Sequence, residues 1–461
     1  MRGSQIANCT LEVVGMAANK WVNVSNALHI GHASGFQVRG NTILHVAEGA
    51  SRPTDPAHNY GGEPAPCGQA SPNNYAMRLN TSSDGSLTDN VMVMGCHGYC
   101  AHSTQRLLLE GNTFQAVGKV GLEGSGFSSQ STGAFNRFTA FLRNRDIGVN
   151  AAFVNSSVHR MADESFTSDG SYGGYFGLAA ARQTNLSNHA QHTLELQGEI
   201  QPNQCAGEHQ GPFEPGFSND CGWGGGALYV VQGSGAGQLR TVVAARTGSR
   251  FVEVDRPFST ALDQTSLVTL CTYIGDAVVA GNHFSNGTAV QYYGSAFHAV
   301  IADNVLANMT GSETVGGGIH FNSMRYGNGV QPNFGIEVRG NLLSYSDGIA
   351  ISGGFNQSTW PGNSAPERTL THGFIVRNNI LKNVHVAKVG CGAQGCTGPQ
   401  GRNWGNGISI SNAHGGVVEA NRVQVPGSWT RQQWLPANGI AIDSYSNVSM
   451  VLVRGNPPMG Y

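Results

Sequence analysis

The sequence predicts an all-β solenoid that is interrupted by a small β-rich insert, and three observations lead to this prediction. One phrase occurs twice in succession, as Val279-Ala-Gly-Asn282-His-Phe284 and Ile301-Ala-Asp-Asn304-Val-Leu306. The 65 glycines and the charged fraction of 12% fit short strands joined by tight turns. Residues 159–277 lack the phrase and therefore form a separate part. Repetition at intervals of roughly 20 to 25 residues is typical of a solenoid.

The phrase consists of an apolar residue, two variable residues, an asparagine, one variable residue and a second apolar residue. It is too short for a helix and is typical of a strand, a sharp corner and a second strand. Asparagine tolerates the left-handed backbone of such a corner. We expect stacked coils to align the asparagines in a ladder, with each amide donating to the next. Further copies of the phrase centre on Asn41, Asn90, Asn112, Asn341, Asn379, Asn421 and Asn456.

Through these phrases the chain resembles the right-handed parallel β-helix superfamily, which includes pectate lyases, polygalacturonases and many phage tailspikes. The resemblance implies a right-handed parallel β-helix over most of the chain, with a glycan lying along its side if the protein is an enzyme. The motifs of the familiar enzymes are missing. Cys96-His-Gly98 and Thr371-His-Gly373 echo only the Gly-His-Gly of polygalacturonases, and the sequence has no Asp-Asp pair. The Trp-Ile-Asp-His segment of classical pectate lyases is also absent.

The order of these signals divides the chain into three parts. Residues 1–158 are expected to form N-terminal coils, with a long Pro- and Gly-rich loop at about 51–80 and with Asn136 marking a later coil. Residues 159–277 are expected to form the insert, and residues 278–461 the C-terminal coils. Both ends of the chain fall within coil-like phrases. We therefore expect a fragment, an incomplete gene model or a protomer that something else caps.

The insert alternates strand-like runs with glycine turns, which predicts a small barrel-like subdomain beside the helix. Its turn at 233–237 has three glycines but lacks the lysine of a phosphate-binding loop, and a strand follows it, so nucleotide binding is not expected. We expect the turn to let Arg240 reach a carboxylate such as Asp163 or Asp169. Together with Asp-Arg-Pro at 255–257, these features resemble the insert of β-helix repeat proteins that are largely uncharacterised.

Composition excludes several classes of function. A net charge of −2 and a pI near 6.8 give no basic surface for nucleic acid. No run of 18 apolar residues is present, so no membrane span is expected. The cysteines form no CxxC motif with a matched pair of histidines, so no metal site is expected. No cofactor is indicated. Calcium would suit a lyase, but no residue pattern points to it.

Cysteines and glycosylation sequons favour an extracellular or secreted setting, including the cell surface. Among the nine cysteines, three pairs are close in sequence, and disulfides there would fasten surface loops, although buried free thiols are the alternative. These pairs are Cys96 with Cys100, Cys205 with Cys221, and Cys391 with Cys396. Nine Asn-x-Ser/Thr sequons favour a glycoprotein. The N-terminal Met-Arg-Gly-Ser, by contrast, carries no apolar signal segment.

Catalysis on a glycan would depend on carboxylates, and the richest group is Asp163, Glu164 and Asp169, next to His159 and Arg160. Hydrolysis needs two acids about 5 Å apart in retaining enzymes and about 6.5–9.5 Å apart in inverting ones. Acids this close in sequence can raise the pKa of one of them, as a general acid requires. The alternative is structural, in which the aspartates cap turns and Glu164 pairs with an arginine.

Two histidines, His298 and His320, are separated by the same interval as the twin asparagines, so we expect them to share one face of the helix and to join the catalytic group. Coils are roughly 4.8 Å apart, which would place both imidazoles near one sugar ring. The alternative is an exposed histidine ladder without a ligand. Neighbouring aromatic and cationic residues would then bind substrate, together with Arg240: Tyr292, Tyr293, Arg325 and Tyr326. Arg339, Arg377 and Arg454 share one slot of the repeat, where we expect a solvated column of cations.

Two hypotheses follow. The first is an extracellular carbohydrate-active enzyme, a glycoside hydrolase rather than a lyase, that cleaves a polysaccharide in a groove between insert and helix. The second is a non-catalytic structural or adhesive glycoprotein that self-associates end to end through its exposed coils into filaments.

Overall fold

A computed structural model gives the structure of the chain. It describes the following residues: 3–14, 27–46, 75–80, 82–94, 97–102, 104–116, 125–130, 137–147, 150–154, 175–178, 193–200, 223–271, 273–287, 289–293, 295–309, 318–326, 329–346, 348–353, 371–384, 407–424, 440–442 and 449–456. None of the described residues belongs to a helix that is long and apolar enough to cross a membrane.

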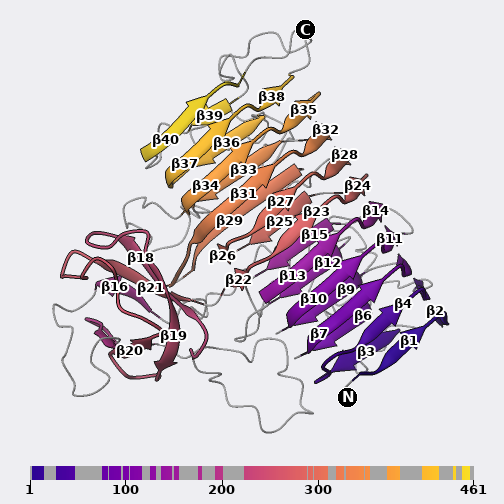
Figure 1. The fold of residues 1–461 in the computed structure, drawn as a ribbon, viewed down its shortest axis with the longest axis horizontal. Helices are drawn as coiled ribbons and strands as arrows, with labels where there is room; N and C mark the ends of the chain where they lie inside the picture. The colour runs from indigo at the N-terminus through magenta and orange to yellow at the C-terminus, as the bar shows by residue number, and fades with distance from the viewer. Residues whose placement is uncertain are drawn as a thin grey trace, which may run out of the picture.

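The described residues form a parallel β-helix, which confirms the predicted fold class (Figure 1). Each coil contributes one segment to each of three parallel sheets, in the order sheet A, sheet B, sheet C, before the chain moves up to the next coil. Strands far apart in sequence therefore lie side by side. For example, β13 (Arg137–Leu142) pairs with β23 (Val278–Ala280) across the whole insert.

Sheet A contains β1 (Gln5–Ala7), β4 (Gln37–Arg39), β7 (Ser83–Thr88), β10 (Gln105–Glu110), β13, β22 (Ile274–Gly275), β23, β26 (Ala296–Phe297), β27 (Val300–Ala302), β31 (Asn333–Arg339), β34 (Thr371–Arg377), β37 (Ala413–Glu419) and β40 (Ser449–Arg454). Sheet B contains β2 (Thr10–Val14), β5 (Thr42–Val46), β8 (Val91–Met94), β11 (Thr113–Ala116), β14 (Arg145–Ile147), β24 (His283–Ser285), β28 (Val305–Met309), β32 (Leu342–Ser346), β35 (Ile380–Lys382) and β38 (Arg422–Val423). Sheet C contains β3 (Leu28–Gly31), β6 (Tyr75–Asn80), β9 (His97–His102), β12 (Ser125–Gln130), β15 (Asn150–Val154), β25 (Ala289–Tyr293), β29 (Gly318–Tyr326), β30 (Gly329–Gln331), β33 (Ile349–Gly353), β36 (Ile408–Ser411) and β39 (Ile440–Ile442).

The corners of the coils occupy left-handed backbone, as the repeated phrase predicts. The residue before each ladder asparagine has a φ between 50° and 68°, from Arg143 to Gly111. A second left-handed position lies six residues before the asparagine and is occupied by residues such as Asp84, Asp276 and His298. Glycine, asparagine and aspartate adopt this backbone at low cost, which explains why they recur at these positions.

The asparagine ladder is confirmed and runs without a break along the helix. From Asn90 onward, each side-chain Oδ1 accepts from both the backbone N–H and the Nδ2 of the asparagine in the preceding coil, and each Nδ2 also donates to a carbonyl. The Oδ1 of Asn41 accepts from the backbone N–H of Cys9. The amides from Asn41 to Asn421 are buried, that of Asn456 is partly exposed, and every side-chain donor and acceptor among them is satisfied. The members are Asn41, Asn90, Asn112, Asn144, Asn282, Asn304, Asn341, Asn379, Asn421 and Asn456.

Asn144 corrects the expectation that Asn136 marks this coil, because Asn144 is the residue that bonds to Asn112 and Asn282. Its phrase is atypical, since Asp146 follows it where the other coils have an apolar residue. Asn136 lies outside the described residues.

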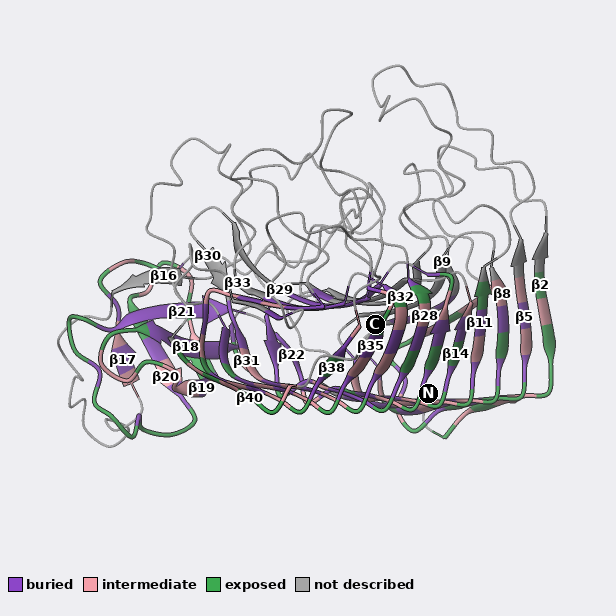
Figure 2. Ribbon diagram, turned by 90° about the horizontal axis from the view of Figure 1, so that it is seen from above, coloured by how far each residue is buried: buried purple, intermediate pink, exposed green. Residues whose placement is uncertain are grey.

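The core is a single apolar column enclosed by the three sheets, and buried residues alternate with exposed ones along the strands (Figure 2). Aromatic rings stack within it. Phe141 lies 5.8 Å from Phe114 and 6.2 Å from Phe284, measured between ring centroids. Tyr292 and Phe321 stack at 4.7 Å in the next coils. The apolar cluster itself is continuous from coil to coil, which makes the described helix one packed body rather than separate coils.

The insert sheet is antiparallel and open, with strand order β16 (Tyr175–Leu178), β21 (Leu267–Cys271), β18 (Ala227–Gln232), β19 (Leu239–Ala245), β20 (Phe251–Val254), β17 (Thr193–Glu195). Register shifts in the β18–β21 and β19–β20 pairs bend the sheet. It has its own core, which includes Trp223, Leu228 and Val252. In the described residues β16 and β17 are not paired with each other, so these strands do not close into a barrel.

The insert lies against the outer face of sheet A, to one side of the helix axis (Figure 1). Tyr229 of β18 provides the central contact. Its ring stacks on Phe297 at 6.0 Å and meets the edges of Phe334 at 5.8 Å and of His372 at 5.4 Å. Leu239 packs into the same cluster. The insert and helix are therefore in direct apolar contact at this place.

Candidate functional site

The acidic group Asp163, Glu164 and Asp169 lies outside the described residues. For three of the expected substrate-binding residues only the backbone is described. Tyr293 ends β25, and Arg325 and Tyr326 end β29, where they pair with the antiparallel strand β30. The expected site therefore remains a prediction in these parts.

His298 and His320 do not share a face, so this expectation is wrong. His298 follows β26 in sheet A, whereas His320 lies in β29 of sheet C, opposite Gln291. The reason is that the two coils differ in length. Sheet C begins seven residues after Asn282, at Ala289, but fourteen residues after Asn304, at Gly318. Counting the same number of residues along the chain therefore leads to different sheets in the two coils.

In the preceding coil, the neighbour of His298 is Asp276. Asp276 lies as many residues before His298 as His320 lies after it. The Oδ1 of Asp276 lies 3.3 Å from His298 Nδ1, and the two side chains are 36% and 52% exposed. An exposed pair of this kind contributes little to stability. His320 is buried, with an exposure of 1%.

Tyr292 is also buried, and the expectation that it stacks on substrate is wrong. It points into the helix core against Phe321, and burial raises the pKa of its hydroxyl well above the usual range. Strand alternation explains this, because Val290 and Tyr292 occupy the inward positions of β25.

Arg240 has a structural role within the insert. Its described hydrogen-bond partners are carbonyls and Gln238, and none of them is an acid. Its guanidinium donates to the carbonyls of Pro257 and Leu239, at 2.8 and 2.6 Å, and lies 4.8 Å from the ring centroid of Phe258. The residue is 8% exposed, and burial lowers the pKa of the guanidinium. The fork of donors thus fastens β19 to the segment after β20.

The glycine-rich turn serves packing. A Cβ at Gly233 would lie 1.9 Å from the carbonyl oxygen of Thr265, and a Cβ at Gly237 would contact Nδ1 of His372 at 3.6 Å. Gly233, Gly235 and Gly237 all have positive φ. Only glycine suits a left-handed turn pressed this closely between the insert strands and sheet A.

The arginines two residues before the ladder asparagines do not form a column of free cations. Arg339 pairs with Asp303 and Glu337, both at 3.3 Å. Arg377 pairs with Glu337 at 2.9 Å, and Arg454 pairs in the same way with Glu419. Carboxylates of adjacent coils neutralise these positions, so we assign them no binding role.

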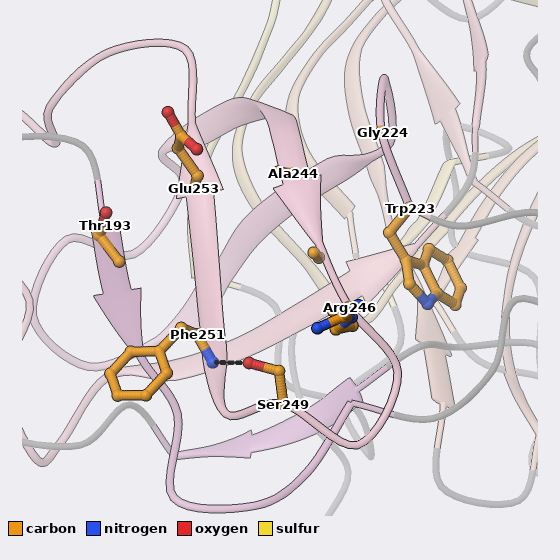
Figure 3. A pocket seen from close by; sticks show the side chains of 9 residues that line it. Thr193, Trp223, Gly224, Ala244, Arg246, Ser249, Phe251 and Glu253 are labelled. Carbon is orange, nitrogen blue, oxygen red and sulfur yellow. Dashed lines mark hydrogen bonds between the residues drawn. The ribbon is translucent and has the colours of Figure 1, made fainter. Parts of the chain in front are cut away.

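A pocket of about 380 Å³ opens on the insert sheet (Figure 3). It lies at the lower end of the usual range for ligand pockets, about 300–1,000 Å³. Strands β17, β19 and β20 and the segment before β18 supply its walls. The lining residues are Thr193, Trp223, Gly224, Ala244, Ala245, Arg246, Ser249, Phe251 and Glu253.

The hairpin between β19 and β20 fixes the pocket geometry. The N–H of Ser249 donates to the carbonyl of Arg246 at 2.9 Å, which closes the turn. The hydroxyl of Ser249 then accepts from the N–H of Phe251 at 3.0 Å (Figure 3). Thr193 and Glu253 are paired residues of β17 and β20. The polar groups are therefore carried by paired strands and a tight turn.

Two charged groups of the pocket are available to a ligand. Among the described residues of the insert, the side chains of Arg246 and Glu253 have no ion pair. By comparison, Arg250 pairs with Glu195 and Arg256 with Asp255. Figure 3 shows Arg246 on the side of Trp223 and Glu253 on the side of Thr193, with Phe251 next to Ser249. Phe251 is 43% exposed, so its ring is accessible to a ligand in the pocket.

Sequence reasoning missed this pocket, although part of the signal was present. In Phe251-Val252-Glu253-Val254 the valines are buried and the other two residues face outward. Strand alternation thus places an aromatic residue and an acid on the same outer face. The contributions of Thr193 and Trp223 depend on tertiary pairing, which no local pattern reveals.

In the part of the chain that the structure describes, no three His, Cys, Asp or Glu side chains gather as a metal site would require. Cys9 and Cys271 are free thiols. Burial raises the pKa of the Cys271 thiol to about 12, so it is not a reactive nucleophile. The expected disulfide pairs involve side chains outside the described residues.

Comparison with known proteins gives no matching family model and no matching curated protein. Similar solved structures include a DFA-IIIase from Arthrobacter chlorophenolicus A6 in complex with GF2, with 10% identity, coverage of 92% of this chain and 68% of that chain, and a TM-score of 0.40. The Dettilon tailspike protein is 9% identical over 97% and 61% of the chains, with a TM-score of 0.33. A family 28 exopolygalacturonase from Yersinia enterocolitica is 10% identical over 83% and 47%, with a TM-score of 0.29.

The chain thus spans about half to two thirds of the length of these structures. At such TM-scores the comparisons add no argument about function. The fold is established by the strand pairing within this chain.

Proposed function

We propose that the protein is an extracellular carbohydrate-binding β-helix and that the insert pocket holds a sugar residue of its polysaccharide ligand. The observation that carries the proposal is one pocket that combines an exposed aromatic ring with a cation and a carboxylate, neither of which has an ion pair among the described residues. Aromatic rings cover the apolar faces of small ligands, while a few convergent polar groups set orientation. Charged groups hydrogen-bond more strongly than neutral ones, which suits a ligand rich in hydroxyls.

Replacing Phe251 by alanine should weaken binding of the best oligosaccharide at least tenfold, equivalent to about 1.4 kcal/mol, because aromatic anchors dominate small interfaces. Arg246→Gln should have an effect of similar size. Isothermal titration with a panel of neutral and acidic oligosaccharides would measure both. Matched controls are Val243→Ala and Arg256→Gln, which alter an exposed valine and an exposed arginine of the insert that do not line the pocket. Equal affinity of all four variants would contradict the assignment.

We further propose that the protein cleaves this polysaccharide. Asp163, Glu164 and Asp169 would supply the acid/base chemistry, as in a glycoside hydrolase. Asp163→Asn, Glu164→Gln and Asp169→Asn should each leave the circular dichroism spectrum unchanged, and at least one should lower turnover on the order of 10²–10⁴-fold. Release of reducing ends measures the rate. Asp263→Asn, an exposed acid elsewhere in the insert, is the control. Full activity in all three variants would refute this catalytic group.

The alternative proposal is a non-catalytic glycoprotein that assembles end to end. It is favoured by one observation. Within the described residues, β1 and β40 each pair with only one neighbour in sheet A. Unpaired strand edges are templates for association with another chain.

A further inference from the structure

Asp146 is an ionisable residue inside the hydrophobic core of the β-helix. It lies in the middle of β14 in sheet B, opposite Phe114 on one side and Phe284 on the other. Its exposure is 0%, and neither carboxyl oxygen has a hydrogen-bond partner among the described residues. The other coils carry an apolar residue at this register position, namely Ile43, Met92, Phe114, Phe284, Leu306, Leu343, Leu381 and Val423.

None of the described residues that face Asp146 carries a positive charge that could compensate an ionised carboxylate. Phe141, from the same coil, stacks between Phe114 and Phe284 and so fills the core at this level. The titratable residues beside it in sheet B, Arg145 and His283, are exposed on the opposite face. In sheet C, β12 and β15 contain no ionisable residue, and Tyr292 of β25 is buried and uncharged. A carboxylate at this position would be isolated in an apolar medium.

The coil that carries Asp146 joins the two halves of the β-helix, so this residue affects more than its local stability. The coil is the last one before the insert, and it must pair with the first coil after it. The ladder bonds between Asn144 and Asn282 therefore join residues 138 apart in sequence, at 2.8 and 3.1 Å. In sheet A, β13 meets β22 through the single residue pair Arg137 and Gly275, and meets β23 through three pairs. We call this contact the seam.

We propose that Asp146 acts as an acid-dependent lock on the seam, where the neutral carboxylic acid permits close packing and ionisation loosens the two halves of the helix. Burial raises the pKa of this carboxyl well above its ordinary range. The folded state therefore keeps the proton at a pH where the unfolded chain has released it. In that interval the unfolding equilibrium constant rises about tenfold per pH unit, so stability falls as pH increases. The fall begins near the ordinary aspartate pKa, about 3.9, and stops at the folded-state value.

The test is equilibrium urea unfolding of the full chain between pH 4 and pH 8, for the unaltered protein and for Asp146→Leu and Asp146→Asn. Leucine matches Leu306 and Leu343 in other coils, and asparagine keeps the shape without ionising. The ratio of unfolding constants between the unaltered protein and either variant should grow about tenfold per pH unit above pH 4, for as long as the pH stays below the folded-state pKa. An unsatisfied amide in Asp146→Asn would shift its whole curve but not its slope, so the test does not depend on that variant being stable.

Hydrogen exchange locates the effect. Amides of 140–147 and 278–285 should exchange faster with rising pH, after correction for intrinsic rates, in the unaltered protein but not in the variants. Asp89→Asn, at an exposed corner, is the matched control and should follow the unaltered protein. Parallel pH profiles for the unaltered protein, Asp146→Leu and Asp146→Asn would overturn the proposal, as would acceleration spread evenly over all coils.

Discussion

Asn304→Ala should destabilise the β-helix by about 4 kcal/mol. The side chain is completely buried. Its Oδ1 accepts two bonds from Asn282, and its Nδ2 donates to the carbonyl of Val279 and to Oδ1 of Asn341, all at 2.9 Å. Alanine would leave the backbone N–H and the Nδ2 of Asn282 without their acceptor, and would remove one of the donors to the Val279 carbonyl and to Oδ1 of Asn341. Each buried unsatisfied group costs roughly 1–3 kcal/mol.

Denaturant unfolding followed by circular dichroism would measure this loss. Asn308→Gly is the matched control, because Asn308 is an exposed corner asparagine with a positive φ that bonds to the exposed Asn286 at 2.8 Å. Glycine keeps the left-handed backbone, so the control should cost less than about 1 kcal/mol. If both variants unfolded at the same denaturant concentration, the ladder would not be a main source of stability.

The ladder is also the feature that sequence predicted best, for a physical reason. A buried amide with four satisfied bonds and a left-handed residue beside it restrict the local sequence so strongly that the phrase survives in nearly every coil. The phrase weakens at Asn144, where Asp146 replaces the apolar residue, and there the prediction chose Asn136 instead. Among the described coils, the one whose phrase departs from the pattern is therefore also the one that carries an acid in its core.

Function was harder to predict because neighbours in a solenoid are set by strand register and not by interval in sequence. Asp276 and His298 lie together one coil apart, since no loop intervenes between their equivalent positions. His298 and His320 have the same interval, but the longer connection between β28 and β29 places them in different sheets. The pocket was missed for a related reason, because Thr193, Trp223 and Arg246 converge only through antiparallel pairing.

Tyr229 permits a test of how the insert is held, because its ring and its hydroxyl contribute in opposite ways. The ring is fully buried among Phe297, Phe334 and His372, with centroid distances of 6.0, 5.8 and 5.4 Å. Removing a buried aromatic side chain costs about 3–5 kcal/mol, so Tyr229→Ala should detach the insert from sheet A at low denaturant. Hydrogen exchange of 227–232 and 333–339 would report the detachment.

Tyr229→Phe should behave differently. The hydroxyl is buried without a hydrogen-bond partner in the described part of the chain, and desolvation raises its pKa well above the ordinary value, so it remains neutral and unsatisfied. Because phenylalanine keeps the stacked ring and removes an unpaired polar group, exchange protection at the contact should be equal to or greater than that of the unaltered protein. A loss in Tyr229→Phe as large as that in Tyr229→Ala would show that a polar interaction, and not aromatic packing, holds the insert against the helix.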